Sequence, residues 1–157
     1  MTTISTRQAG LHDLETIAPM FNAYRQFYEQ PSDLELAREF IRMRLQNSES
    51  IILLAADSSG RSAGFCQLYP SFCSVEAKPI YTLYDLYVRP ESRRGGAGKA
   101  LLLAAHDYAQ TVGMVRMDLT TAKTNSGAQA LYESLGWVRD EVFLAYNKRV
   151  AVGVTRP

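Results

Sequence analysis

Residues 84–102 have the sequence Tyr84-Asp85-Leu86-Tyr87-Val88-Arg89-Pro90-Glu91-Ser92-Arg93-Arg94-Gly95-Gly96-Ala97-Gly98-Lys99-Ala100-Leu101-Leu102. An apolar strand leads through a proline-marked turn and a glycine-rich loop into an apolar helix. Glycine lets backbone amides approach a ligand closely, and the first turn of a helix presents unpaired N–H groups with partial positive charge. Arg93, Arg94 and Lys99 add full positive charges. Together these properties predict an anion site suited to a phosphate.

Two well-known nucleotide motifs do not match this loop. A P-loop requires glycine five positions before Gly98-Lys99 and serine or threonine after it, but those positions hold Arg93 and Ala100. A dinucleotide-binding fingerprint that starts at Gly96 requires glycine or alanine where Leu101 stands. The spacing therefore excludes both nucleotide folds.

Outward from the loop, hydrophobic periodicity predicts alternating helices and strands. Helices are expected over residues 12–28, directly after Ser32, over about 98–112 and over about 125–135. Strands are expected at residues 3–7, 50–56, 62–69, 79–88, 114–120, 138–141 and 143–148. This order predicts an α+β fold with a mixed sheet.

Composition restricts the class of protein. The chain has 157 residues, a formal net charge of +1 and 46% hydrophobic residues, which predicts a single domain over residues 1–157. The near-neutral charge argues against nucleic acid as a partner. The longest apolar run, residues 51–56, is far below the roughly 20 residues of a membrane span, and no secretory pattern opens the chain, so we expect a cytoplasmic protein without membrane partners. Two cysteines without zinc-type spacing predict no disulfide framework and no metal.

Two sequence blocks resemble those of the GNAT superfamily of N-acetyltransferases. The acyl-CoA loop of that family reads Arg or Gln, two residues, Gly, any residue, and Gly or Ala, and residues 93–98 are similar to it. About 30 residues downstream, Asn125-Ser126-Gly127-Ala128-Gln129-Ala130-Leu131-Tyr132-Glu133-Ser134-Leu135-Gly136-Trp137 resembles the second family block. Residues 64–70 and 83–88 are similar to the branch of diamine, polyamine and histone/polyamine acetyltransferases.

The resemblance implies a fold and a cosubstrate. It implies a GNAT fold whose mostly antiparallel sheet has about six or seven strands, flanked by about four helices and splayed near acetyl-CoA. The pantetheine arm of acetyl-CoA would lie along the central strand, where a bulge is expected near Tyr87. The residues implied in binding acetyl-CoA are Leu86, Tyr87, Val88, Arg93, Arg94, Gly95, Gly96, Ala97, Gly98, Lys99, Asn125 and Tyr132.

Two residues are candidates for catalysis. Tyr132 matches the aromatic position of the family whose phenol donates a proton to the departing coenzyme A thiolate; the alternative is a core aromatic residue. Asp85 is the nearest carboxylate on the central strand and would bind the substrate cation or accept its proton through water; the alternative is a buried structural aspartate. In the polyamine-acetylating branch an acidic pair stands here, but Tyr84 replaces its first member. Tyr24, Tyr28, Tyr84 and Asp85 are the predicted acceptor-binding residues, because aromatic faces suit a cation.

The sequence therefore predicts an acetyl-CoA-dependent enzyme that acetylates a primary amine of a small molecule by direct attack in a ternary complex. The acceptor classes considered are a polyamine, an amino acid and an aminoglycoside-like compound. Two alternatives remain open, a protein-lysine or histone-type acetyltransferase and a noncatalytic acyl-CoA-binding sensor. A homodimer is expected, to which the tail over residues 150–157 would contribute.

Overall fold

The computed structural model describes residues 3–151. Its elements in chain order are β1 (Ser5–Gln8), a 3₁₀ turn (Leu11–Asp13), α1 (Leu14–Phe27), α2 (Leu34–Gln46), β2 (Ile51–Ala56), β3 (Ser62–Cys73), β4 (Lys78–Val88), a 3₁₀ turn (Pro90–Ser92), α3 (Ala97–Thr111), β5 (Met117–Asp118) and α4 (Ser126–Ser134). The chain divides into two compact units, Met1–Thr120 and Thr121–Pro157. The single domain stays a prediction, and the tail expected to join a dimer lies outside the described residues from position 152 onward.

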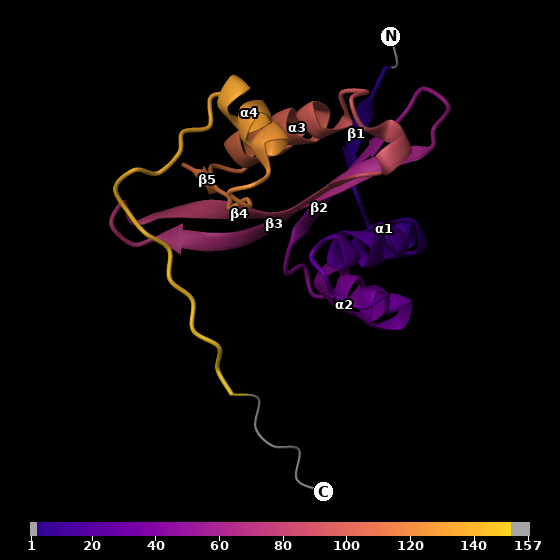
Figure 1. Cartoon of the computed structure of the whole chain (residues 1–157), viewed down its shortest axis with the longest axis horizontal. Helices are drawn as coiled ribbons and strands as arrows, with labels where there is room; N and C mark the ends of the chain where they lie inside the picture. Colours follow the sequence, from indigo (N-terminus) through magenta and orange to yellow (C-terminus); the bar gives the residue numbers. More distant parts are fainter. Residues whose placement is uncertain (1–2, 152–157) are drawn as a thin grey trace, which may run out of the picture. The chain divides into compact units, whose positions relative to one another are not determined.

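The first unit is a five-stranded sheet with helices on both faces. The strand order is β1-β2-β3-β4-β5, and all neighbours are antiparallel except β4 and β5, which are parallel. Figure 1 shows α1 and α2 on one face of this sheet and α3 on the other. With α4 of the second unit, the described residues contain four α-helices, so the predicted α+β class is confirmed.

The predicted number of six or seven strands is wrong for the described residues, which form five. The two closing strands expected at residues 138–141 and 143–148 are absent there, and their apolar side chains, including Val138 and Phe143, are largely exposed. A strand pattern becomes a strand only when its backbone groups pair with a neighbouring strand. Alternating apolar residues and β-propensity were therefore not sufficient to predict these two strands correctly.

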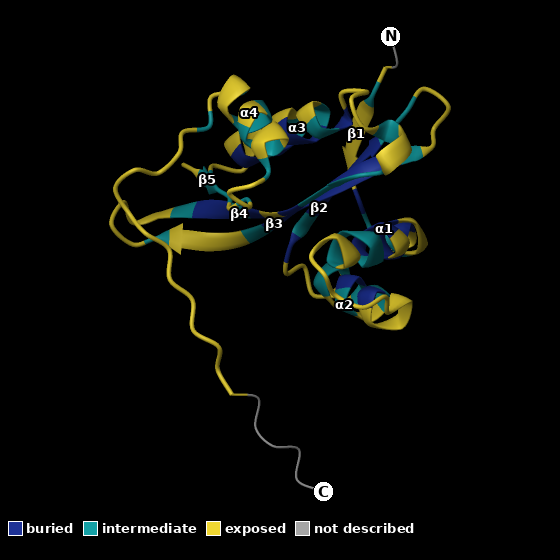
Figure 2. Ribbon diagram, in the orientation of Figure 1, coloured by how far each residue is buried: buried dark blue, intermediate teal, exposed yellow. Residues whose placement is uncertain are grey.

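An apolar core fixes α1 against the sheet. Ile17 and Phe21 of α1, Ile41 of α2 and Phe65 of β3 are buried together, and Figure 2 shows burial concentrated on the strands and the inner helix faces. Each such side chain contributes roughly 1.5–3 kcal/mol through removal of apolar surface from water. The ring of Tyr24, one turn after Phe21, meets Phe65 edge-on at 6.4 Å between centroids. The core thereby holds the end of α1 over the middle of β3.

An extra residue in β4 changes which face of the sheet Asp85 occupies. Leu68 of β3 lies opposite Leu83, whereas Gln67 lies opposite Asp85, so Tyr84 has no partner and forms a β-bulge. In a regular strand, residues 83 and 85 would point to the same face. The bulge instead puts Leu83 on one face and Asp85 on the other, beside Gln67.

Aromatic contacts identify the two faces. Phe65 shares a face with Gln67, two positions away, and its ring contacts Tyr24 of α1. Tyr81 shares the opposite face with Leu83, and its ring lies 6.2 Å from that of Tyr108 in α3. Asp85 therefore lies on the α1 side. The bulge expected near Tyr87 was predicted at the wrong place, because Tyr87 pairs in register with Phe65.

Candidate active site

Asp85 lies at one end of a chain of buried polar side chains. Its carboxylate is only 3% exposed, and its Oδ2 atom accepts a hydrogen bond from Nε2 of Gln67, which is fully buried. The Oε1 atom of Gln67 in turn accepts a hydrogen bond of 2.7 Å from the hydroxyl of Ser50. Sequence reasoning missed Gln67 and Ser50, although one polar residue within the apolar run of β3 was an available signal.

The end of α1 contacts the same carboxylate. The hydroxyl of Tyr24 donates to the backbone carbonyl of Tyr84 at 3.1 Å and lies near the Asp85 carboxylate. Burial raises the pKa of Asp85 above its ordinary value, while the hydrogen bond from Gln67 and the nearby Tyr24 hydroxyl oppose this rise. Burial and the negative charge of Asp85 raise the pKa of the Tyr24 phenol. Asp85 is therefore a carboxylate able to take up a proton more readily than an exposed one.

Aromatic rings surround Asp85 and include the other predicted acceptor residues. The rings of Tyr24 and Tyr28 are 5.1 Å apart, and those of Tyr69 and Tyr84 are 5.7 Å apart, both edge-on. Tyr28 and Tyr84 keep 47% and 67% of their surface exposed. The four predicted residues, Tyr24, Tyr28, Tyr84 and Asp85, thus come together in the first unit. Tyr69 adjoins this group, and burial together with the charge of Asp85 raises the pKa of its phenol.

Strand β4 keeps an unpaired edge beyond the bulge. Strand β5 pairs only with Tyr81 and Thr82, so within the described part of the chain no strand adjoins residues 83–88 on that side. Strand β5 ends at Asp118, and the splay of the strands near acetyl-CoA that the family resemblance implied stays a prediction. Three residues predicted to bind acetyl-CoA, Leu86, Tyr87 and Val88, lie on this stretch. An unpaired edge can accept an extended chain with amide groups through backbone hydrogen bonds.

The glycine-rich loop leads directly from β4 into α3. Arg93 Nε donates to the carbonyl of Val88 at 3.2 Å, which ties the loop to the strand. Arg94 and Gly96 have left-handed φ values of 64° and 88°, and a left-handed arginine is uncommon. Helix α3 begins at Ala97 without a side-chain cap. Its first amides are therefore available to an anion, which agrees with the predicted phosphate site.

Two predicted residues belong to the second unit. The Oδ1 atom of Asn125 accepts a hydrogen bond of 3.2 Å from the Ala128 amide and so caps α4. Tyr132 lies within α4, and its ring centroid is 6.1 Å from that of Trp137. The amide of Trp137 also donates to the Tyr132 carbonyl at 3.1 Å, which closes the end of the helix. The roles of Asn125 and Tyr132 toward acetyl-CoA stay predictions.

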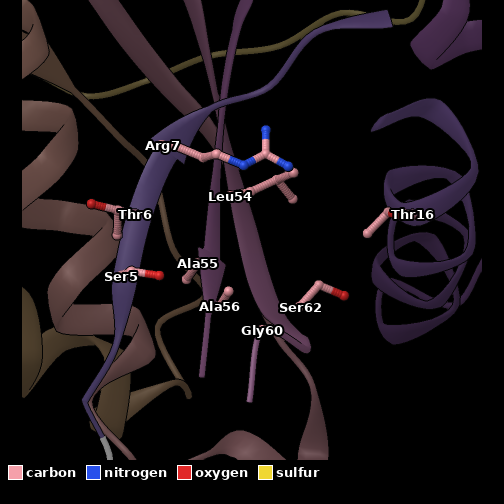
Figure 3. Close-up of a pocket in the computed structure, with 9 residues that line it drawn as sticks. All are labelled: Ser5, Thr6, Arg7, Thr16, Leu54, Ala55, Ala56, Gly60 and Ser62. Carbon is pink, nitrogen blue, oxygen red and sulfur yellow. The ribbon is translucent and has the colours of Figure 1, made fainter. Parts of the chain in front are cut away.

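A pocket of about 490 Å³ beside β1 and β2 contains none of the predicted residues. Figure 3 shows Arg7 and Ser62 among the side chains around it. Arg7 is the ionisable group of this lining, and it forms a 2.7 Å ion pair with Asp13, whose pKa it lowers to about 2. The charge of Arg7 is thus already compensated by Asp13. We therefore place the candidate active site around Asp85 and not in this pocket.

Neither a membrane span nor a metal cluster occurs in residues 3–151. No helix in this range is long and apolar enough to cross a membrane. In the same range, no three His, Cys, Asp or Glu side chains are grouped so that they could hold a metal ion.

Comparisons with known proteins agree with this geometry. The sequence pattern of the acetyltransferase (GNAT) family matches residues 17–137. The uncharacterized N-acetyltransferase YhfO of Bacillus subtilis is 48% identical over 143 residues, which cover 91% of this chain and 95% of that protein. The crystal structure of a probable acetyltransferase has a TM-score of 0.88 and 40% identity, with coverage of 94% and 99%.

The fold is also shared with an aminoglycoside N-acetyltransferase, AAC(6')-Iy, solved in complex with CoA. That structure has a TM-score of 0.76 and 21% identity and covers 96% of this chain and 97% of its own. At this identity the likeness concerns the fold alone. The family match over residues 17–137 and the 48% identical relative show that this chain belongs to the GNAT family of acetyltransferases and is an N-acetyltransferase.

Proposed function

We propose that this N-acetyltransferase transfers the acetyl group of acetyl-CoA to the primary amine of a small molecule, by direct attack in a ternary complex. The observation that carries this proposal is the buried carboxylate of Asp85 beside Tyr24, whose hydroxyl bonds to the backbone of the neighbouring Tyr84. A carboxylate with aromatic residues nearby suits an alkylammonium group, because both attract a cation.

The acceptor must lose a proton before it can attack. An alkylammonium with a pKa near 10.4 is only about one part in a thousand neutral at pH 7.4, which costs roughly 4 kcal/mol. Asp85 accepts this proton, directly or through a water molecule, and the free amine attacks the thioester carbonyl. An N–H group on the open edge of β4 stabilises the charge that develops on the carbonyl oxygen. The raised pKa of Asp85 suits this role, since it makes the carboxylate a stronger base than an exposed one.

Acetyl-CoA binds along the edge of β4 and at the start of α3 in this proposal. Backbone groups of Leu86 and Val88 hold the pantetheine arm, and the amides from Arg94 to Lys99 hold the diphosphate. The unpaired edge, the left-handed Gly96 and the uncapped start of α3 support this assignment. Asn125 adds a hydrogen bond to the pantetheine arm.

Tyr132 donates a proton to the departing coenzyme A thiolate in this proposal. We expect Tyr132→Phe to lower kcat by about 10²-fold or more, as is typical when general acid catalysis is lost, without weakening acetyl-CoA binding. Tyr146→Phe serves as the control, because Tyr146 is 90% exposed. Steady-state kinetics combined with calorimetry of acetyl-CoA binding makes the comparison. An unchanged kcat would remove Tyr132 from the mechanism.

An acceptor screen tests the function as a whole. Release of the CoA thiol is followed with polyamines, amino acids, aminoglycosides and a histone-type peptide as acceptors. We expect turnover with one class of small amine. Turnover with the peptide alone would identify a protein-lysine acetyltransferase, and acetyl-CoA binding without thiol release from any acceptor would identify a sensor. The relation to the polyamine and histone branch and the homodimer stay predictions.

A further inference from the structure

The buried chain behind Asp85 has no part in the mechanism described so far. The hydroxyl of Ser50 donates to Oε1 of Gln67, and Nε2 of Gln67 donates to Oδ2 of Asp85. All three side chains are buried, with exposed fractions of 6%, 0% and 3%. A buried side-chain amide is costly unless its donor and acceptor atoms are paired, and Gln67 finds a partner for each.

The direction of these hydrogen bonds depends on the charge of Asp85. An ionised carboxylate can only accept hydrogen bonds, so Gln67 must turn its NH₂ group toward it. The amide oxygen of Gln67 then faces Ser50, whose hydroxyl must donate. The observed chain is therefore the one that an ionised Asp85 requires.

We infer that Gln67, oriented by Ser50, is a positioning residue that holds the Asp85 carboxylate ionised and leaves its Oδ1 atom to accept the proton of the acceptor amine. This inference rests on the proposed function, because only there does Asp85 receive a proton. Gln67 reaches Asp85 because the bulge at Tyr84 brings both residues to one face of the sheet. Both polar residues thereby act through Asp85 and need no contact with the substrate.

Other titratable groups face Asp85 from the neighbouring elements. They are Tyr24 of α1, whose ring contacts Tyr28, together with Tyr69 of β3 and the adjacent Tyr84 of β4; Arg44 of α2 acts on Tyr69, and Cys66 of β3 responds to the charge of Asp85 from the other face of the sheet. Burial raises the pKa values of Tyr24 and Tyr69, and it raises that of the Cys66 thiol to about 12. These three groups therefore keep their protons at neutral pH, and their titration does not overlap with that of the Asp85 carboxyl.

Gln67→Met tests the inference, because methionine has a similar length but no amide. Gln67 donates to the charged form of Asp85, so its loss favours the protonated form and raises the pKa of Asp85. We expect a rise of about one pH unit, in line with the loss of one hydrogen bond to a charged group. Side-chain carboxyl NMR of the free protein measures the rise directly. The acid limb of the kcat/KM profile should shift to higher pH by the same one unit, so that kcat/KM at a given pH on that limb falls about tenfold.

Ser50 provides a matched pair of variants. Valine and threonine have nearly the same shape, but only threonine keeps a hydroxyl that can donate to Gln67. We expect Ser50→Val to raise the pKa of Asp85 by less than Gln67→Met does, and Ser50→Thr to keep the wild-type pKa. If Ser50→Val and Ser50→Thr shifted the pKa of Asp85 equally, the shift would result from altered packing, and the role proposed for the Ser50 hydroxyl would be overturned.

The two readouts separate this inference from the proposed function. An unchanged NMR pKa of Asp85 in Gln67→Met would overturn the inference. A raised NMR pKa with an equally displaced kcat/KM profile supports it. A raised NMR pKa without any displacement of the profile also supports the positioning of Asp85, but it would overturn the proposal that Asp85 takes the proton from the acceptor.

Discussion

Asp85→Asn is expected to lower kcat/KM by about 10²-fold to 10⁴-fold, because the acceptor loses the group that takes its proton. Asparagine has almost the same shape and can still accept a hydrogen bond from Gln67, but it cannot accept a proton at neutral pH. The acid limb of the pH profile that reports Asp85 should disappear in this variant. Steady-state kinetics between pH 5 and 9, with the acceptor found in the screen, measures both effects.

The same variant is expected to be more stable than the wild type at neutral pH. Burial raises the pKa of Asp85 in the folded protein above its value in the unfolded chain, which is about 3.9. The folded state therefore binds this proton more tightly, and the wild type loses stability as the pH rises from about 4 through the raised pKa. Asparagine does not titrate. The gain in free energy of unfolding of Asp85→Asn over the wild type is therefore absent below pH 4 and reaches its full size above the pKa of Asp85 in the folded protein.

A control must separate charge removal from burial. Asp107 lies exposed on α3, so Asp107→Asn removes the same formal charge without relieving a buried carboxylate. Urea unfolding of the three proteins at several pH values gives the free energies of unfolding. A stability gain in Asp85→Asn that does not change with pH would contradict the link to ionisation, and full activity would exclude Asp85 as the base.

The sequence predicted the local features of this site and missed those that depend on strand register. The glycine-rich loop could be predicted because a left-handed turn and a helix start are encoded within a few neighbouring residues, as at Gly96 and Ala97. The bulge could not be placed, because Tyr84 becomes an extra residue only through the pairing of β4 with β3. The partnership of Gln67 with Asp85 follows from the same register and was missed for the same reason.

The aromatic residues show the same difference between features set by local sequence and features set by tertiary packing. Tyr24 and Tyr28 were predicted on a helix, where four positions apart means one face, and their rings do touch. Their proximity to Tyr84 depends on how α1 packs over β3, which the core around Phe65 determines. Chemical type and local spacing thus predicted an aromatic group that the structure brings together, while tertiary packing decided what lies next to Asp85.

Gly96→Val is expected to weaken acetyl-CoA binding by about tenfold to a hundredfold, which corresponds to the loss of about one hydrogen bond to a charged group. Gly96 has a φ of 88°, where a β-branched residue is strained, although a Cβ there would meet no neighbouring atom within 4 Å. The effect therefore comes from the backbone alone. Because the loop must leave its left-handed turn, its amides and those at the start of α3 no longer converge on one anion.

Gly113→Val provides a control with the same strain at a different place. Gly113 has a φ of 83°, equally open space around its Cβ, and lies after the far end of α3. Both variants should lose similar free energies of unfolding, but only Gly96→Val should lose affinity in calorimetric titrations with CoA. If both bind CoA as the wild type does, the amides before α3 do not hold the diphosphate. A loss of CoA affinity in both variants would mean instead that backbone strain at either end of α3 weakens binding. The comparison therefore separates the geometry of the loop from strain in general.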